Sequence, residues 1–89
     1  MLFMIIERFK PPGAAPIGQR FRATGRMLPD GVTYHASWVD STGIQCFQIM
    51  EAPDRQSLDP WIEDWSDLVD FEIIPVETSA DFWSRSLPE

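Results

Sequence analysis

The sequence predicts one small α+β domain whose elements run strand, helix, strand, strand, helix, strand, followed by a short C-terminal helix. Three observations carry this prediction: strand-like apolar runs, two segments with apolar residues at helical spacing, and a turn that joins the second and third strands as a hairpin. The chain has 89 residues, which is enough for one domain and too few for two. We therefore expect residues 1–89 to form a single domain.

The first strand and the first helix are separated by a proline-rich loop. Residues 2–9 are apolar over most of their length, as in a central strand covered on both faces, and Pro11-Pro12-Gly13 ends the strand. A helix is predicted with Pro16 in its first turn. Apolar and small residues recur in it at helical spacing: Ile17, Phe21, Thr24 and Leu28. Gly25 lies inside this predicted helix at a cost of about 1 kcal/mol relative to alanine, and the turn Leu28–Gly31 ends it.

A hairpin is predicted from residues 32–39 and 44–51. Asp40 at the first position of the turn and Gly43 at the fourth favour a type I turn with Gly43 in a left-handed conformation. A two-residue loop would pair Asp40 with Gly43, whereas a three-residue loop would pair Asp40 with Ile44. The turn chemistry favours the three-residue loop.

In both registers, alternate residues of the first hairpin strand share a face. His35 and Ser37 lie on one face, and Tyr34 and Trp38 lie on the other. We expect the Tyr34/Trp38 face to lie under the helices and the His35/Ser37 face to point toward a partner subunit. The two-residue loop would also place Gln48 opposite His35.

The strongest helical periodicity of the chain follows the hairpin. Its apolar residues form one stripe: Leu58, Trp61, Ile62, Trp65, Leu68 and Val69. Pro60 fits the first helical position if Asp59 caps the helix, so a short turn is expected before a regular helix from about Asp59. Residues 68–76 are the fourth strand, whose Pro75 places its end at a sheet edge. Thr78 is then the cap of the short last helix.

This order of elements is the split β-α-β arrangement of the ferredoxin-like fold, with four antiparallel strands and two helices on one face. The strands carry apolar residues on both faces, so the face without helices needs a cover. A second copy of the chain is the simplest one, and we expect a homodimer through this open face.

Charge and composition exclude several classes of protein. Fourteen acidic and seven basic residues give a net charge of −7, whereas nucleic-acid binders neutralise phosphates with Lys and Arg. One cysteine, Cys46, and one histidine make no disulfide and no Cys/His zinc site within this chain. We expect Cys46 to be buried and inert, and no cofactor or metal is predicted. The run Leu2–Ile6 is too short for a membrane span, so we expect a cytoplasmic protein that binds neither nucleic acid nor membranes.

No strong catalytic motif is present, so the catalytic candidates are single residues. Histidine is the residue type most often used for proton transfer near neutral pH, so His35 could shuttle a proton, although a hydrogen-bonded histidine at an interface is the commoner role. Glu7 follows a buried run, and a desolvated carboxyl group has a raised pKa that suits general acid–base chemistry. The simpler alternative for Glu7 is a strand-end carboxylate paired with Arg8 or Arg20.

An aromatic pocket for a flat ligand, between helix and sheet, is the second candidate site. Tyr34, Trp38 and Trp65 are its candidate ligand-binding residues, together with Trp61 and with Gln48 on the third strand. Because Trp61 and Trp65 lie on the apolar stripe of the second helix, packing in the core is their ordinary role.

Three segments of the chain resemble a family of short bacterial proteins known only as a domain of unknown function: Met1–Phe9, Gly31–Trp38 and Trp65–Val76. Pro60 departs from the helix-forming residue usual in that family. The family is similar in topology to the dimeric α/β-barrel superfamily, which includes cofactor-free monooxygenases, muconolactone isomerases and haem-degrading enzymes. The resemblance implies a homodimer with two sheets packed face to face and a ligand cleft between sheet and helices. It carries over no catalytic residue, because a fold does not fix a function.

Three functions follow from these observations. The first is a homodimer that binds a small aromatic or lipophilic molecule and, if it is an enzyme, transfers a proton or performs cofactor-free oxidation or isomerisation. The second is a structural or regulatory homodimer without a ligand. The third is an RNA-recognition module, which shares this order of elements but needs a basic and aromatic signature strand that the sequence lacks.

Overall fold

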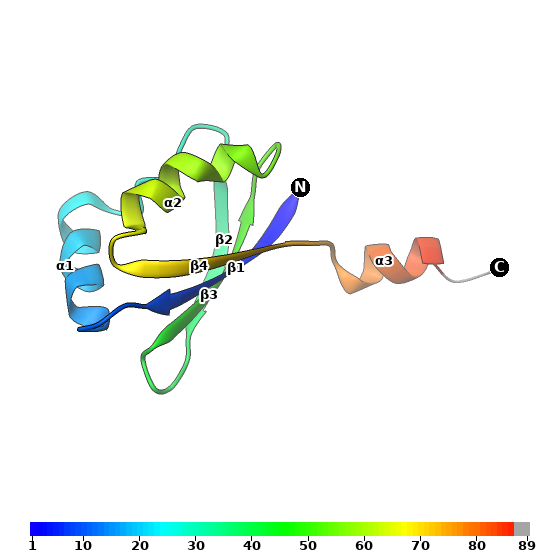
Figure 1. Cartoon of the computed structure of the whole chain (residues 1–89). Coiled ribbons are helices and arrows are strands. Elements are labelled where there is room, and N and C mark those ends of the chain that lie inside the picture. The colour runs from blue at the N-terminus through cyan, green and yellow to red at the C-terminus, as the bar shows by residue number, and fades with distance from the viewer. Residues whose placement is uncertain (87–89) are drawn as a thin grey trace.

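The computed structural model describes residues 1–86 and has the predicted order of elements (Figure 1). The elements are β1 (Leu2–Phe9), α1 (Ala14–Thr24), β2 (Thr33–Val39), β3 (Gln45–Glu51), the 3-10 turn η1 (Gln56–Leu58), α2 (Asp59–Trp65), β4 (Val69–Val76) and α3 (Ser79–Ser86). The strands form one antiparallel sheet in the order β2-β3-β1-β4. This is the ferredoxin-like arrangement, and the predicted fold class is confirmed.

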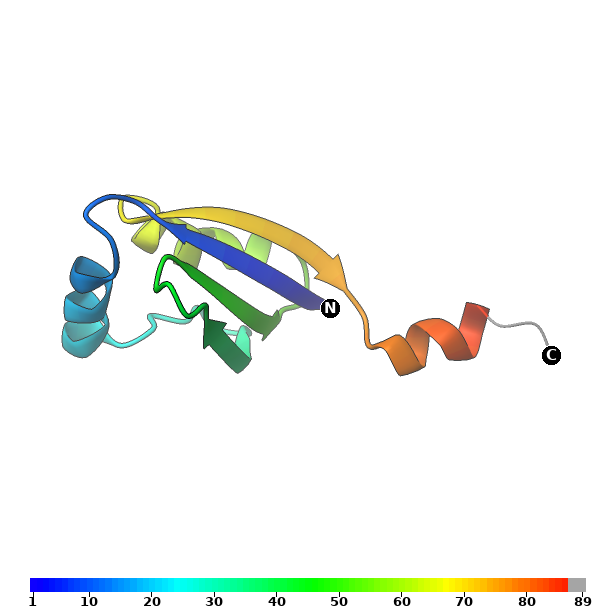
Figure 2. The same ribbon diagram turned by 90° about the horizontal axis from the view of Figure 1, so that it is seen from below.

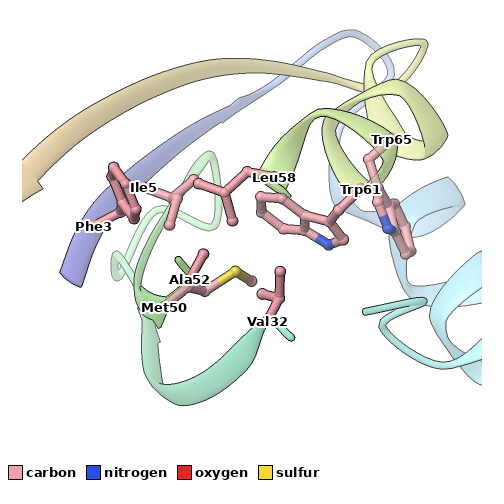
Figure 3. Packing of buried hydrophobic residues seen from close by; sticks show 8 residues of the cluster. All are labelled: Phe3, Ile5, Val32, Met50, Ala52, Leu58, Trp61 and Trp65. Carbon is pink, nitrogen blue, oxygen red and sulfur yellow. The ribbon is translucent and has the colours of Figure 1, made fainter. Parts of the chain in front are cut away.

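The core lies between α2 and one face of the sheet. Phe3 and Ile5 alternate with less buried residues along β1, so both point to the same face. Leu58, Trp61 and Trp65 reach this face from η1 and α2 (Figure 3). Three smaller or more flexible residues complete the cluster: Val32, Met50 and Ala52. A Leu, Ile, Phe or Met side chain stabilises the fold by roughly 1.5–3 kcal/mol when it is fully buried.

The second helix begins as the sequence predicts. A 3-10 turn comes first, and α2 then starts at Asp59 with Pro60 in its first turn, where the missing N–H is not needed. This start places Trp61 and Trp65 one turn apart on the buried side. The last helix is also as expected, since the backbone N–H of Asp81 donates to Oγ1 of Thr78 at 3.0 Å. None of the helices within residues 1–86 is long and apolar enough to cross a membrane.

The first helix ends earlier than the sequence predicts. It stops at Thr24, and Gly25 follows with φ 70° and ψ −160°, its N–H donating to the carbonyl oxygen of Phe21 at 2.8 Å. The prediction that Gly25 lies inside a helix running to Leu28 is therefore wrong. The glycine ends the helix because its backbone angles are almost closed to other residues. No residue of α1 is buried, and the helix stands beside the end of the sheet (Figure 1).

Both predicted hairpin registers are wrong at the turn. Val39 pairs with Cys46, and the N–H of Asp40 donates to the carbonyl oxygen of Gln45 at 2.9 Å, so four residues form the loop. The Asp40 carboxylate accepts hydrogen bonds from Thr42 Oγ1 at 2.8 Å and from the N–H of Ile44 at 3.2 Å. These bonds hold Ile44 within the loop instead of in the strand.

An irregularity in β2 changes which residues share a face. The register shifts between Tyr34 and Ala36, as at a β-bulge. Tyr34 lies opposite Met50, on the helix side as predicted. Trp38 then lies opposite Phe47 on the open side, and Ser37 lies on the helix side, so the prediction for these two residues is wrong. One extra residue is enough to reverse the alternation.

The sheet face opposite α2 is open. Apolar side chains from all four strands occupy it: Leu2, Met4, Ile6, Ala36, Trp38, Phe47, Ile49, Ile74 and Val76. None of the elements within residues 1–86 covers this face, and α3 extends away from the sheet (Figure 2). Phe82 and Trp83 of α3 are exposed and in edge-to-face contact with one another.

Replacing Gly25 with alanine should lower the free energy of unfolding by about 1–3 kcal/mol, because alanine is strained at these backbone angles. Gly18→Ala is the matched control. Gly18 lies within α1 with open space around its Cβ position, so alanine there should stabilise the protein by about 0.5–1 kcal/mol. Urea unfolding of both variants measures the two effects, and equal effects at the two positions would contradict this account of where α1 ends.

Candidate functional site

A cavity of about 270 Å³ lies between the helix side of the sheet, α1 and α2. Its walls are mainly apolar and come from all three parts: Ile17, Phe21, Val39, Trp61, Trp65 and Val69. Its polar lining consists of Glu7, Arg26, Ser37, Cys46 and Gln48. The cavity is therefore an apolar space with a few polar groups, which is the usual composition of a small-molecule site.

One strong contact fixes α1 at the distance that leaves this cavity. Both terminal nitrogens of Arg20 donate to the two carboxylate oxygens of Asp67 at 2.7 Å, and Nη1 also donates to the carbonyl oxygen of Asp64 at 2.9 Å. The same guanidinium lies 5.5 Å from the ring centre of Trp65. This fork-shaped pairing is geometrically specific, and it ties α1 to the end of α2 and the turn after it, while no residue of α1 is fully buried and Ile17 is its half-buried contact with the core.

Glu7 is buried on the sheet side of the cavity. It lies on β1 directly opposite Cys46, and both of its carboxylate oxygens accept a hydrogen bond from Nε2 of Gln48 at 2.8 Å. Burial raises the pKa of Glu7 from 4.5 to about 6, although the Gln48 hydrogen bond and the charge of Arg26 both lower it in part. A carboxyl group with this pKa holds or releases its proton near neutral pH.

Cys46, unlike Glu7, does not exchange its proton near neutral pH. Burial and the neighbouring charge of Glu7 raise the pKa of its thiol to about 11, which outweighs the lowering by Arg26. The thiol is therefore protonated at neutral pH and is a poor nucleophile, in agreement with the expectation of a buried, inert cysteine.

Arg26 is a residue of this site that the sequence analysis missed. Its guanidinium carbon lies 3.7 Å from the ring centre of Tyr34 and 5.2 Å from that of Phe21, and the side chain lines the cavity. Its carbonyl oxygen accepts a hydrogen bond from Nε1 of Trp65 at 3.2 Å. The signal in the sequence was Gly25, which ends the helix one residue earlier and so releases Arg26 from it.

Two buried polar atoms beside the cavity have no hydrogen-bond partner within residues 1–86. They are Oε1 of Gln48 and Nε1 of Trp61, an acceptor and a donor. Most buried polar atoms in proteins have partners, so such atoms mark places where a water or ligand contributes hydrogen bonds. No group of three or more His, Cys, Asp and Glu side chains suited to a metal ion occurs among the described residues.

The candidate residues fall into two groups. Glu7, Gln48 and Trp65 line the cavity, and Tyr34 contacts its wall through Arg26. Trp38 lies on the open face of the sheet instead. His35 lies on that face too, where its Nε2 is 2.8 Å from Oε1 of Glu51. The two catalytic candidates are thus on opposite sides of the sheet, and only Glu7 is at the cavity.

The raised pKa of Glu7 predicts a pH dependence of stability. Below about pH 4.5, Glu7 is protonated in both the folded and the unfolded chain, and its full contribution is present. Between about pH 4.5 and pH 6 the unfolded chain releases this proton more readily than the folded chain does. The free energy of unfolding therefore falls over this range, by roughly 2 kcal/mol relative to a chain without this group.

Urea unfolding between about pH 4 and pH 7.5 tests this at constant protein concentration. Glu7→Gln should lack the decrease, while the exposed control Glu63→Gln should keep it. Parallel pH profiles for the wild type and Glu7→Gln would contradict the assigned pKa.

Comparisons with known proteins identify a family but no characterised relative. The family described as "Domain of unknown function (DUF3303)" matches residues 1–86. No curated protein and no solved structure gives a match. Since the family match spans nearly the whole chain, the protein belongs to the DUF3303 family of domains of unknown function.

Proposed function

We propose that the protein is a homodimer that binds a small aromatic or lipophilic molecule in the cavity between its sheet and its helices. The observation that carries this proposal is the cavity itself, which remains beside a core that is otherwise tightly packed. A helix–sheet interface without a cavity would have argued against ligand binding.

The lining of the cavity supports this class of ligand. Its volume is near the lower end of the roughly 300–1,000 Å³ usual for small-molecule sites, which suits a molecule of about one ring. Phe21 and Trp65 offer flat apolar surfaces on two sides. Aromatic side chains bind flat apolar molecules through large contact areas and offset or edge-on ring contacts.

The open sheet face supports the homodimer. Its centre is apolar, whereas polar contacts lie at its margins: the ion pair of Arg8 with Glu72 at 3.0 Å and the hydrogen bond between His35 and Glu51 at 2.8 Å. An apolar centre with a polar rim is typical of protein interfaces. A second copy meets this face through the same residues, as a two-fold axis requires.

The size of the open sheet face supports a part for α3 in the proposed interface. Four strands about 4.8 Å apart and about 26 Å long present roughly 500 Å², below the ~800 Å² per partner of a standard interface. Phe82 and Trp83 of α3 are exposed just beyond the end of β4. In a dimer these two rings would extend the apolar surface onto the partner.

A second candidate, proton transfer on the bound molecule, is favoured by Glu7. A carboxyl group at an apolar cavity with a pKa of about 6 is suited to act as a general acid or base. Cofactor-free isomerases and monooxygenases occur in the dimeric α/β-barrel superfamily that the chain resembles, and this resemblance supports the candidate. His35 lies on the other side of the sheet, where it would serve the interface between subunits.

Ligand binding is tested by thermal shift with a panel of single-ring probes such as phenol, indole and phenylacetate. A probe at about 100 times its Kd stabilises the protein by about 2.7 kcal/mol and raises Tm. Phe21→Ala should weaken binding about tenfold, because Phe21 lines the cavity. Ile44→Ala is the control, since Ile44 is also an exposed apolar residue, at 57% against 44% for Phe21, and it lies in the hairpin loop away from the cavity lining. If no probe raises Tm, the ligand-free structural homodimer replaces this proposal.

Dimerisation is tested by light scattering after size exclusion. Trp38→Asp should convert the dimer to a monomer, because it places a charge on the open face, while the matched control Ile44→Asp should leave the dimer intact. Both side chains are exposed in the isolated chain, Trp38 at 59% and Ile44 at 57%, so neither change should unfold the monomer. A wild-type protein that stays monomeric at millimolar concentration would overturn the homodimer.

A further inference from the structure

The charge of Arg26 at the cavity is not balanced by an ion pair. Five of the seven basic side chains have a carboxylate oxygen within 4 Å of a side-chain nitrogen: Arg8, Lys10, Arg20, Arg55 and Arg85. Arg22 and Arg26 are the two without one among residues 1–86. The acidic residues outnumber the basic ones by 14 to 7, so an unpaired arginine that is half-buried is unexpected in this chain.

The backbone holds Arg26 in a defined position. Gly25 before it has φ 70°, and Met27 after it has φ 59°, which is uncommon for a residue other than glycine. The Trp65 side chain donates to the Arg26 carbonyl oxygen and ties this loop to α2. Strained backbone of this kind persists where the surrounding structure fixes it, and it is common at ligand sites.

Stacking orients the guanidinium but leaves its hydrogen-bond donors free. The guanidinium carbon lies 3.7 Å from the centre of the Tyr34 ring, and the five in-plane N–H donors of the group make no hydrogen bond within residues 1–86. The charge is felt within the cavity, since Arg26 is the one cation that lowers the pKa of both Glu7 and Cys46. The free edge of the guanidinium is thus a ready partner for a planar anion.

We propose that the ligand is a small aromatic or lipophilic carboxylic acid, whose carboxylate pairs with the guanidinium of Arg26 while its apolar body lies against Phe21 and Trp65. This inference rests on the proposed function and names the ligand class of the same cavity. A carboxylate matches the planar, two-pronged geometry of a single guanidinium. A phosphate-bearing ligand is disfavoured because, within the described part of the chain, no second basic side chain lines the cavity.

Glu7 makes this binding depend on pH. The groups that face its carboxyl are Gln48 and Cys46 on β3, Phe71 on β4 and Arg26, which also lines the cavity, so among residues 1–86 Arg26 is the one charged neighbour. When Glu7 is ionised it competes for Arg26 and repels a bound carboxylate. Affinity for an ionised acid should therefore rise several-fold as the pH falls from 7.5 to about 5, and Glu7→Gln should remove this dependence.

The direct test is calorimetric titration of the full chain with phenylacetate and with its neutral analogue phenylacetamide. The wild type should bind phenylacetate about tenfold more tightly than phenylacetamide. Arg26→Gln should lose this preference and still bind phenylacetamide. The control Arg22→Gln removes the same charge from the exposed side of α1 and should keep the preference.

The outcomes separate this inference from the proposed function. If phenylacetamide binds as tightly as phenylacetate to the wild type, or if Arg22→Gln and Arg26→Gln weaken phenylacetate equally, the cavity binds ligands but Arg26 is no anchor for an acid. If neither probe nor any other member of the aromatic panel binds, the proposed function fails and this inference fails with it. The comparison of two probes on the wild type remains decisive even if Arg26→Gln does not fold.

Discussion

The incomplete cover of the sheet by its helices is the constraint on which the rest of the structure depends. Leu58, Trp61 and Trp65 pack against the half of the helix side that carries Phe3, Ile5 and Met50, and they form a closed core there. The other half carries Glu7, Cys46 and Gln48, and among the described elements none lies directly on it, because the cavity separates it from α1 and α2. Because α1 is tied to α2 through Arg20 and Asp67 and buries none of its residues, the space beside these polar groups stays open.

The inward-facing side of β1 ends with a buried polar residue, Glu7. The apolar alternation of β1 ends with Glu7 where the next inward residue would be expected to be apolar. A hydrogen bond from Gln48 satisfies the carboxyl group but leaves the amide oxygen of Gln48 without a partner. A packed apolar residue at this position would stabilise a small domain more. The buried carboxyl group therefore does not serve stability, which agrees with the acid–base role proposed for it.

Much of the fold could be predicted because local signals agreed with one another. Pro60, the stripe from Leu58 to Trp65 and the apolar run of residues 2–9 each predicted an element that the structure contains. The errors arose where one residue shifts the geometry. The bulge at His35 turns Trp38 to the open face, and Gly25 ends α1 one turn before the predicted end. Neither a bulge nor the backbone angles of a glycine can be read from hydrophobic periodicity.

Part of the candidate site could be predicted, namely the residues that lie on regular helices and strands. Glu7, Gln48 and Trp65 lie on regular elements whose inward positions follow from alternation and helical spacing, and they come together at the cavity. Arg26 lies in a loop, and its position depends on the left-handed residues on either side of it. Backbone angles of this kind produce no periodic pattern in a sequence.

The central claim is that the space between α1, α2 and the sheet is a binding site, and methyl NMR tests it most directly. On addition of phenylacetate, the account predicts that the largest shifts occur at Ile17, Val39 and Val69, which line the cavity, while Met4 and Ile49 on the open face do not move. Shifts confined to Met4 and Ile49, or the absence of any shift at saturating concentration, would contradict it.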